Sequence, residues 1–209
     1  MDRKGIEEAI RKCLEDKGKR KFLQSVEVAI NFKGVDFSKP ENRLNVDVVL
    51  PHGRGREVGV VAFADGQLAL DVKKAGASVV ISSDEIPKLA GDKKRLKTLY
   101  KNAFIAQPSL MAVVGKHLGQ KLAIRDKMPK PITGSVEEAI KRAKKSVVLK
   151  TKGKYLPVVH CLIGSENMSV EQLADNLEAV LDAVKKAVGE GKIRSAYVKL
   201  TMGKPHRVF

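Results

Sequence analysis

Aromatic residues are scarce in this 209-residue sequence, which contains 4% of them and no Trp. Proteins that bind single-stranded nucleic acid by stacking use several exposed aromatic rings, so this composition disfavours that mode of recognition. Cysteine is scarce as well, since Cys13 and Cys161 are the only two. They provide neither a disulfide framework nor a metal-binding pattern. Cys13 lies in a helical stretch and Cys161 in an apolar strand, so both are expected to be reduced core residues, which is typical of a cytosolic protein.

Long apolar runs are also missing. No stretch could span a bilayer, and the first residues, MDRKGIEEAIRK, contain no signal-peptide core. We therefore expect a cytoplasmic protein without a membrane partner. Acidic residues are outnumbered, because 24 Asp and Glu stand against 40 Lys and Arg, a formal net charge of +16. This sign favours a polyanionic partner, with nucleic acid ahead of an acidic membrane surface. No basic amphipathic helix with bulky aromatic residues supports the membrane alternative.

Patterns of catalytic or metal-binding residues are weak. The four histidines are scattered without ligand spacing, and no Ser-His-Asp or paired-carboxylate arrangement is present. The stretch GRGREVG (53–59) resembles a phosphate-binding loop, but its glycines lie between two expected strands and the Lys-Ser/Thr of a phosphate loop is missing. We interpret it as a linker. The sequence therefore predicts a protein that is not an enzyme and that binds no cofactor and no metal. The alternative interpretation is a nucleotide-dependent enzyme.

The first third of the chain mixes helical and strand periodicity. Apolar residues recur with helical spacing in IEEAIRKCLED (6–16). SVEVAINF (25–32) and RLNVDVVLP (43–51) alternate apolar and polar residues, as half-buried strands do. A long polar loop separates these two strands, and we expect them to form an antiparallel pair.

From Val58 onward, short apolar strands alternate with helices. Strands are expected at 58–63, 78–83 and 103–107, and helical segments at 68–76, 84–102 and 108–119. Continuous apolar strands that alternate with helices predict a small parallel sheet covered on both faces.

After residue 145 the mixture of strand and helical periodicity found in the first third of the chain returns. Strands are expected at 146–153, 155–164 and 194–203, and a long helix at 169–191, where Ser169 and Gln172 have capping-box spacing. The fold class is therefore mixed α/β (α+β). A discontinuous α+β domain is built from residues 1–53 and 150–209, and an inserted parallel-sheet, Rossmann-like α/β domain comprises residues 54–149.

Two crossings connect these predicted domains. Glycine tolerates the dihedral changes that a hinge requires. We therefore expect hinge residues at Gly53 and Gly55 in the first crossing, and at Lys150 and Gly153 in the second.

Basic residues gather in three runs. Residues 19–21 precede Phe22, residues 140–154 contain seven Lys and Arg, and residues 191–209 contain five without an acid. A single run is usually a solvated face, but three runs in or beside the terminal domain favour one phosphate-binding surface. With few aromatic residues, a structured RNA read through its backbone, 2′-hydroxyls and shape is the better fit. Charge alone does not exclude DNA.

Four segments carry a resemblance to a known family: KFLQSVEVAINFKG, PENRLNVDVVLPHGRG, SVEQLADNLEAVLDAVKK and AYVKLTMGKP. In this order they resemble the family of large-ribosomal-subunit protein one (L-one), in its archaeal form, over essentially the whole chain. The resemblance implies a ribosomal protein that binds large-subunit rRNA at the mobile side stalk beside the tRNA exit site. It also implies a role in release of exit-site tRNA, and repression of translation through binding of its own mRNA. We expect the free protein to be a monomer.

The resemblance also implies which residues contact RNA. They are Lys21, Phe22, Ser25, Glu27, His160, Thr201, Met202, Gly203 and Lys204. One segment departs from the family, because relatives carry a Gly-Pro-Arg-Gly stretch where this chain reads LAIRDKMPKP (122–131). A contact of that segment with RNA or tRNA is therefore not implied.

Residues 201–203 admit two interpretations. In the first they contact RNA without charge. The Thr201 hydroxyl would donate to and accept from a ribose 2′-hydroxyl, Met202 would lie along a sugar or base, and Gly203 would allow close approach. In the second they form an ordinary strand end with Met202 in the core. The resemblance favours the first.

Overall fold

The computed structural model describes residues 3–151 and 156–209. These residues divide into two compact units. Residues 3–56, 145–151 and 156–209 form the terminal unit, and residues 57–144 form the inserted unit. The sequence placed the boundaries at 53/54 and 149/150, whereas the structure divides the chain at 56/57 and 144/145.

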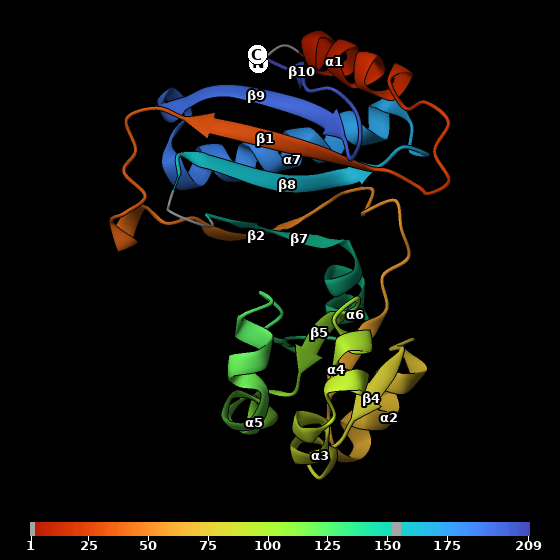
Figure 1. Cartoon of the computed structure of the whole chain (residues 1–209). Helices are drawn as coiled ribbons and strands as arrows, with labels where there is room; N and C mark the ends of the chain where they lie inside the picture. Colours follow the sequence, from red (N-terminus) through yellow and green to blue (C-terminus); the bar gives the residue numbers. More distant parts are fainter. Residues whose placement is uncertain (1–2, 152–155) are drawn as a thin grey trace. The chain divides into compact units, whose positions relative to one another are not determined.

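The terminal unit contains one four-stranded and one two-stranded sheet in its described residues (Figure 1). Its elements are α1 Arg3–Glu15, β1 Ser25–Phe32, η1 Pro40–Asn42, β2 Asn45–Val49, β7 Ser146–Lys150, β8 Val158–Ser165, α7 Val170–Val188, η3 Glu190–Lys192, β9 Ile193–Leu200 and β10 His206–Arg207. The larger sheet has the strand order β10-β9-β1-β8 and is antiparallel throughout.

Burial alternates along β1, as the sequence predicted. Val26, Val28 and Ile30 are fully buried, whereas the residues between them are partly exposed. The buried face packs on α7, which lies behind the sheet in Figure 1. The predicted capping box starts this helix, because the Ser169 side chain and the Gln172 side chain each accept from the other residue's backbone N–H.

The expected pairing of β1 with β2 is wrong. Both edges of β1 are occupied, by β8 on one side and β9 on the other. The loop after β1 is folded, since the Asp36 carboxylate accepts from Ser38 N at 2.9 Å and the buried Phe37 ring meets Phe32 edge-to-face. The chain therefore leaves the sheet, and β2 pairs antiparallel with β7 instead. This pairing is also why residues 146–150 belong to the terminal unit.

The inserted unit is a parallel sheet of order β4-β3-β5-β6. Its elements are β3 Val60–Phe63, α2 Gly66–Lys74, β4 Val79–Ile81, α3 Glu85–Gly91, α4 Lys93–Leu99, β5 Ala103–Ala106, η2 Pro108–Leu110, α5 Met111–Ala123, β6 Lys130–Pro131 and α6 Val136–Lys145. The two-residue strand β6 lies within the segment that departs from the family, and its short sequence gave no strand signal.

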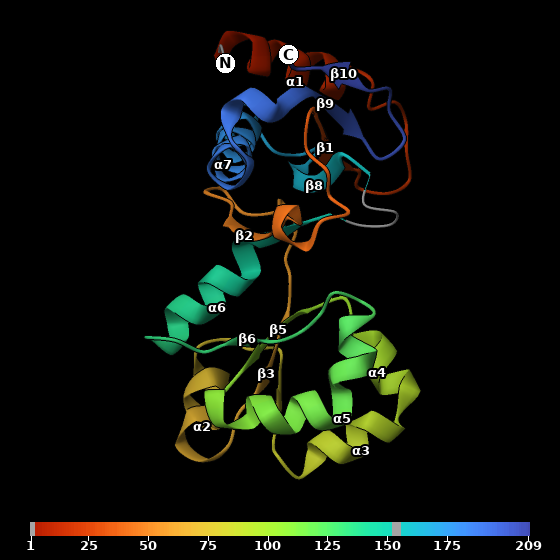
Figure 2. The same cartoon turned by 90° about the vertical axis from the view of Figure 1, so that its left-hand side faces the viewer.

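Both faces of this sheet are covered, as predicted. In β3, Val61 and Phe63 join an apolar cluster with α3, α4 and α5, whereas Val60 and Ala62 join a second cluster with α2 and α6. Figure 2 shows α2 and α6 on the left of the strands and α3 and α4 on the right. No helix within the described residues has the length and apolarity that a membrane span requires.

Candidate nucleic-acid interface

An open hollow of about 470 Å³ lies at the start of β1. Its lining brings together residues from three distant parts of the chain: Phe22, Leu23, Ser25, Glu27, Arg56 and Thr201. Phe22 and Leu23 are 50% and 37% exposed, so two adjacent apolar side chains are accessible at the wall of the hollow. Four of the nine residues predicted to contact RNA therefore line one hollow.

Thr201 fastens the end of β9 to the start of β1. Its backbone N–H donates to Ser25 O at 3.1 Å. Its hydroxyl oxygen accepts from Ser25 N at 3.1 Å and donates to Ser25 O at 3.4 Å. A hydroxyl has one hydrogen and two lone pairs, so one lone pair remains for another molecule. The expectation that this hydroxyl would both donate to and accept from a ribose is corrected, since it is arranged only to accept.

Met202 and Gly203 complete a tight turn. Gly203 N donates to Leu200 O at 3.1 Å, and a Cβ on Gly203 would lie 3.0 Å from the Leu200 Cβ. Glycine therefore suits the turn itself. Met202 is 59% exposed, which excludes the interpretation that places its side chain in the core. A flexible thioether side chain is instead presented to solvent beside the hollow.

Gln24 was missed by the sequence reasoning, although it supports this turn. Its side chain is 1% exposed. Its amide oxygen accepts from Met202 N at 3.1 Å, and its amide nitrogen donates to Lys17 O at 2.8 Å and to the Glu166 carboxylate at 3.1 Å. The available signal was the alternation of β1, which places position 24 on the same side as Val26, where a buried amide needs partners.

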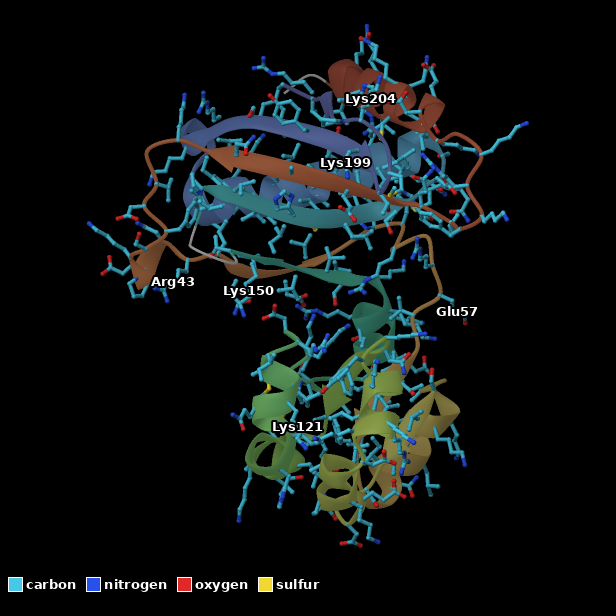
Figure 3. The ribbon with its side chains drawn as sticks, in the orientation of Figure 1. Arg43, Glu57, Lys121, Lys150, Lys199 and Lys204 are labelled. Carbon is cyan, nitrogen blue, oxygen red and sulfur yellow. The ribbon has the colours of Figure 1, made fainter. Side chains whose placement is uncertain are left out.

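Glu27 lies directly opposite Lys199 in the pairing of β1 with β9. Lys199 does not pair with it, because its ammonium donates to Thr201 O at 3.1 Å. Figure 3 labels Lys199 on this open face of the sheet. Among the residues that the structure describes, no hydrogen bond or ion pair engages the Glu27 carboxylate. Its acceptor atoms are therefore free for a ligand.

The remaining predicted contact residues are exposed but less closely grouped. His160 lies opposite Ala29 in β8 and is exposed, so its side chain is accessible to a ligand. Lys21 and Lys204 are also exposed, and Lys204 follows the Met202 turn (Figure 3). The basic run 140–154 belongs to both units and partly lies outside the described residues. One surface shared by all three runs remains a prediction.

The predicted hinge glycines are fixed within the terminal unit. Gly53 and Gly55 have φ angles of +72° and +66°, which favour glycine. Asn176 donates to Gly53 O at 2.9 Å, and the Ser165 hydroxyl donates to Gly55 O at 2.9 Å. A Cβ on Gly55 would lie only 2.1 Å from the Ser165 oxygen. Both glycines therefore form an anchored turn, as expected of a linker between β2 and β3 rather than a loop that opens a helix.

The second crossing also differs from its prediction. Lys150 pairs with Asn45 inside the β7–β2 ladder, and Gly153 lies outside the described residues. In the first crossing, Arg54 Nε donates to Ser146 O at 2.9 Å, and burial lowers the pKa of its guanidinium. This bond fastens the first crossing to the start of β7.

Comparison with known proteins identifies the family of this chain. A statistical model of the ribosomal protein L1p/L10e family matches residues 12–204. The chain is 44% identical to the large ribosomal subunit protein uL1 of Pyrococcus horikoshii, over 100% of this chain and 97% of that protein. It is 41% identical to the uL1 protein of Methanothermobacter thermautotrophicus, over 97% and 98% of the two chains. The uL1 protein of Methanosarcina acetivorans is 39% identical, over 100% of both.

These relatives are archaeal, so the resemblance to the archaeal form is confirmed. They carry the name of a ribosomal protein, and the alternative of a nucleotide-dependent enzyme is therefore rejected. The family match covers nearly the whole chain, including both units and the hollow. The chain belongs to the ribosomal protein L1p/L10e family.

Proposed function

We propose that this protein binds large-subunit rRNA as part of the cytoplasmic ribosome, and that the hollow of the terminal unit is the centre of the contact. The observation that carries this proposal is the junction of Ser25 with Thr201. Hydrogen bonds between these two residues bring together segments that are 176 positions apart. The resulting surface exposes the Phe22 ring and the Met202 thioether beside free acceptor atoms.

The charge of the chain supplies the general attraction to RNA. Lys21 and Lys204 lie in segments next to the hollow and are exposed, so they are available to phosphates. The hollow itself supplies contacts that do not depend on phosphate, namely an exposed ring, a hydroxyl acceptor and a carboxylate. Such groups read bases, which distinguish one RNA from another, and 2′-hydroxyls, which distinguish RNA from DNA.

Within the ribosome, we assign the protein to the mobile side stalk of the large subunit, beside the tRNA exit site. There it would contact the exit-site tRNA and help its release. We further propose that the protein represses its own translation. A segment of its own mRNA that resembles the rRNA site would occupy the same hollow, so the two RNAs would compete for one protein.

Binding of the full chain to a fragment of the rRNA stalk tests the proposal. Filter binding should show selectivity for this fragment over random RNA of equal length. If several Lys and Arg contact phosphates, the logarithm of affinity should fall linearly with the logarithm of salt concentration, by roughly 0.7–0.9 per contact. Selectivity should persist as salt rises. If both affinities fall together, the protein has only a nonspecific basic surface.

Cell-free translation tests the repressor role separately. Added protein should reduce synthesis from its own mRNA and leave an unrelated mRNA unaffected. The stalk fragment should relieve this repression by competing for the hollow. Repression that the fragment does not relieve would mean that mRNA and rRNA use different sites.

A further inference from the structure

We propose that the hollow takes one unstacked guanine base, with the Glu27 carboxylate on its Watson–Crick edge and the Arg56 guanidinium on its Hoogsteen edge. This inference rests on the proposed binding of RNA and specifies the chemistry of that site. Both side chains line the hollow from separate parts of the chain.

A carboxylate is an unexpected group in the RNA site of a protein with a net charge of +16. It repels phosphates and can only accept hydrogen bonds. Lys199 lies opposite Glu27 but bonds Thr201 O instead, so the carboxylate is not held by its nearest cross-strand cation. Its ligand must therefore supply N–H or O–H donors.

Arg56 provides the complementary charge. Its guanidinium donates to the Leu23 carbonyl, which orients the side chain at the wall of the hollow. A guanidinium has five N–H donors, so others remain for a ligand. No ion pair joins Arg56 to Glu27 among the described residues, although both line the same hollow. Each charge is therefore available to a molecule placed between them.

Guanine matches the Glu27 carboxylate and the Arg56 guanidinium better than the other three bases do. Its Watson–Crick edge presents N1–H and the N2 amino group side by side, which matches the two oxygens of a carboxylate. Its Hoogsteen edge presents the O6 and N7 acceptors, which match two guanidinium donors. Adenine and cytosine place an acceptor nitrogen beside their one amino group, and uracil flanks its single N–H with two carbonyls. Each of these bases would set an acceptor against the carboxylate.

The rest of the hollow fits a nucleotide in this position. The half-exposed Phe22 ring offers a stacking surface for a base that has left its helix. The free lone pair of the Thr201 hydroxyl can accept from a 2′-hydroxyl. The contacts to the edges of the base, to its face and to the ribose therefore all come from one hollow.

Analogue substitution in the stalk fragment tests this inference with the full chain. Inosine lacks the N2 amino group of guanosine, and 7-deazaguanosine lacks N7. At one guanosine, each analogue should weaken binding of the wild-type protein roughly tenfold, within the range for a good bidentate base contact. Glu27→Gln should reduce the inosine effect, because one of its two oxygen acceptors becomes a donor, but keep the 7-deaza effect. Arg56→Met should remove the 7-deaza effect but keep the inosine effect.

Matched controls are Glu41→Gln in η1 and Arg95→Met in α4, which lie outside the hollow. Both should keep the full effect of each analogue. If the wild-type protein selects the fragment but no guanosine is sensitive to both analogues, the guanine assignment is wrong and RNA binding stands. If both sensitivities persist unchanged in Glu27→Gln, the carboxylate does not contact the base and the assignment is again wrong. If the wild-type protein does not distinguish the fragment from random RNA, the proposed function fails as well. The analogue results on the wild-type protein decide the guanine assignment even if a variant does not fold.

Discussion

Gln24→Met tests whether the buried amide holds in place the turn that we propose to contact RNA. Methionine has a similar length, so the substitution removes hydrogen bonds while leaving little cavity. Three side-chain bonds are lost, to Met202 N, Lys17 O and the Glu166 carboxylate. At about 1 kcal/mol for a neutral bond and somewhat more for the bond to a charged group, the free energy of unfolding should fall by about 2–4 kcal/mol. Urea denaturation measures this change.

RNA binding gives the second readout of the same variant. Without its bond to the Gln24 oxygen, the Met202 turn loses one of the bonds that hold it at the start of β1, although those of Thr201 with Ser25 remain. Affinity for the stalk fragment should fall at least tenfold, by about 1.4 kcal/mol or more. The salt dependence of binding should not change, because no cation that contacts phosphate is removed.

The matched control is Gln67→Met on α2. The Gln67 amide donates to Asp71 on an exposed helix face, so its loss should change the free energy of unfolding by less than about 0.5 kcal/mol. A folded Gln24→Met variant with reduced stability and unchanged RNA affinity would refute the reasoning. Gln24 would then support the fold without positioning the turn.

Three further predictions concern other parts of the terminal unit. Thr201→Val should lower the free energy of unfolding by only about 1 kcal/mol, because the hydrogen bonds of Thr201 are exposed. Met202→Ala should leave the melting temperature unchanged, because the side chain is exposed. Each substitution should weaken RNA binding by roughly 1–3 kcal/mol in filter-binding assays. Equal losses of stability and binding would contradict this. Asn176→Leu should lower the free energy of unfolding, measured by urea denaturation, by about 3 kcal/mol without changing RNA affinity, because this fully buried amide forms hydrogen bonds with three peptide groups. A decrease below about 1 kcal/mol would show that water takes over these hydrogen bonds in the variant. Burial raises the pKa of the Cys13 thiol to about 11 and that of the Cys161 thiol to about 12, from 9.0. The contribution of these thiols to the free energy of unfolding is therefore fully present below pH 9.0 and is lost as pH rises through the pKa values of the folded protein. A Cys13→Ala, Cys161→Ala double variant should show a shallower alkaline fall in melting temperature, and an identical fall would exclude the thiols as its cause.

Local patterns predicted most of the elements, because burial on one face leaves a periodic signature. The alternation in β1 and the capping box of α7 were both found from sequence, and both are correct. The partner of β2 could not be predicted in this way. Its pairing with β7 depends on which edges of β1 are already occupied, and those edges are filled by strands that lie more than a hundred residues away.

The same limit applies to the candidate site. Phe22 and Thr201 could be named because they lie in motifs that resemble a family. Arg56 carries no motif of its own and lies in the stretch 53–59 that the sequence predicts to be a linker, yet the fold places it in the hollow. The supporting role of Gln24 depends on its hydrogen bonds with Glu166 and Met202, which are distant in the sequence and close in the fold. Residues that act through distant partners are therefore the ones that local reasoning misses.

The hydrogen of the Thr201 hydroxyl has a consequence for RNA modification. Since this hydrogen is directed to Ser25 O, a nucleotide that meets Thr201 must bring a hydrogen of its own. A 2′-O-methylated ribose keeps its oxygen but has no hydrogen to donate, and its methyl group would occupy the place of the bond. The protein would thus discriminate against one methyl group on the RNA, and a stalk fragment methylated at that nucleotide should bind as weakly as its deoxy counterpart. A methyltransferase that acts there before assembly would therefore weaken the binding of the protein to its rRNA site.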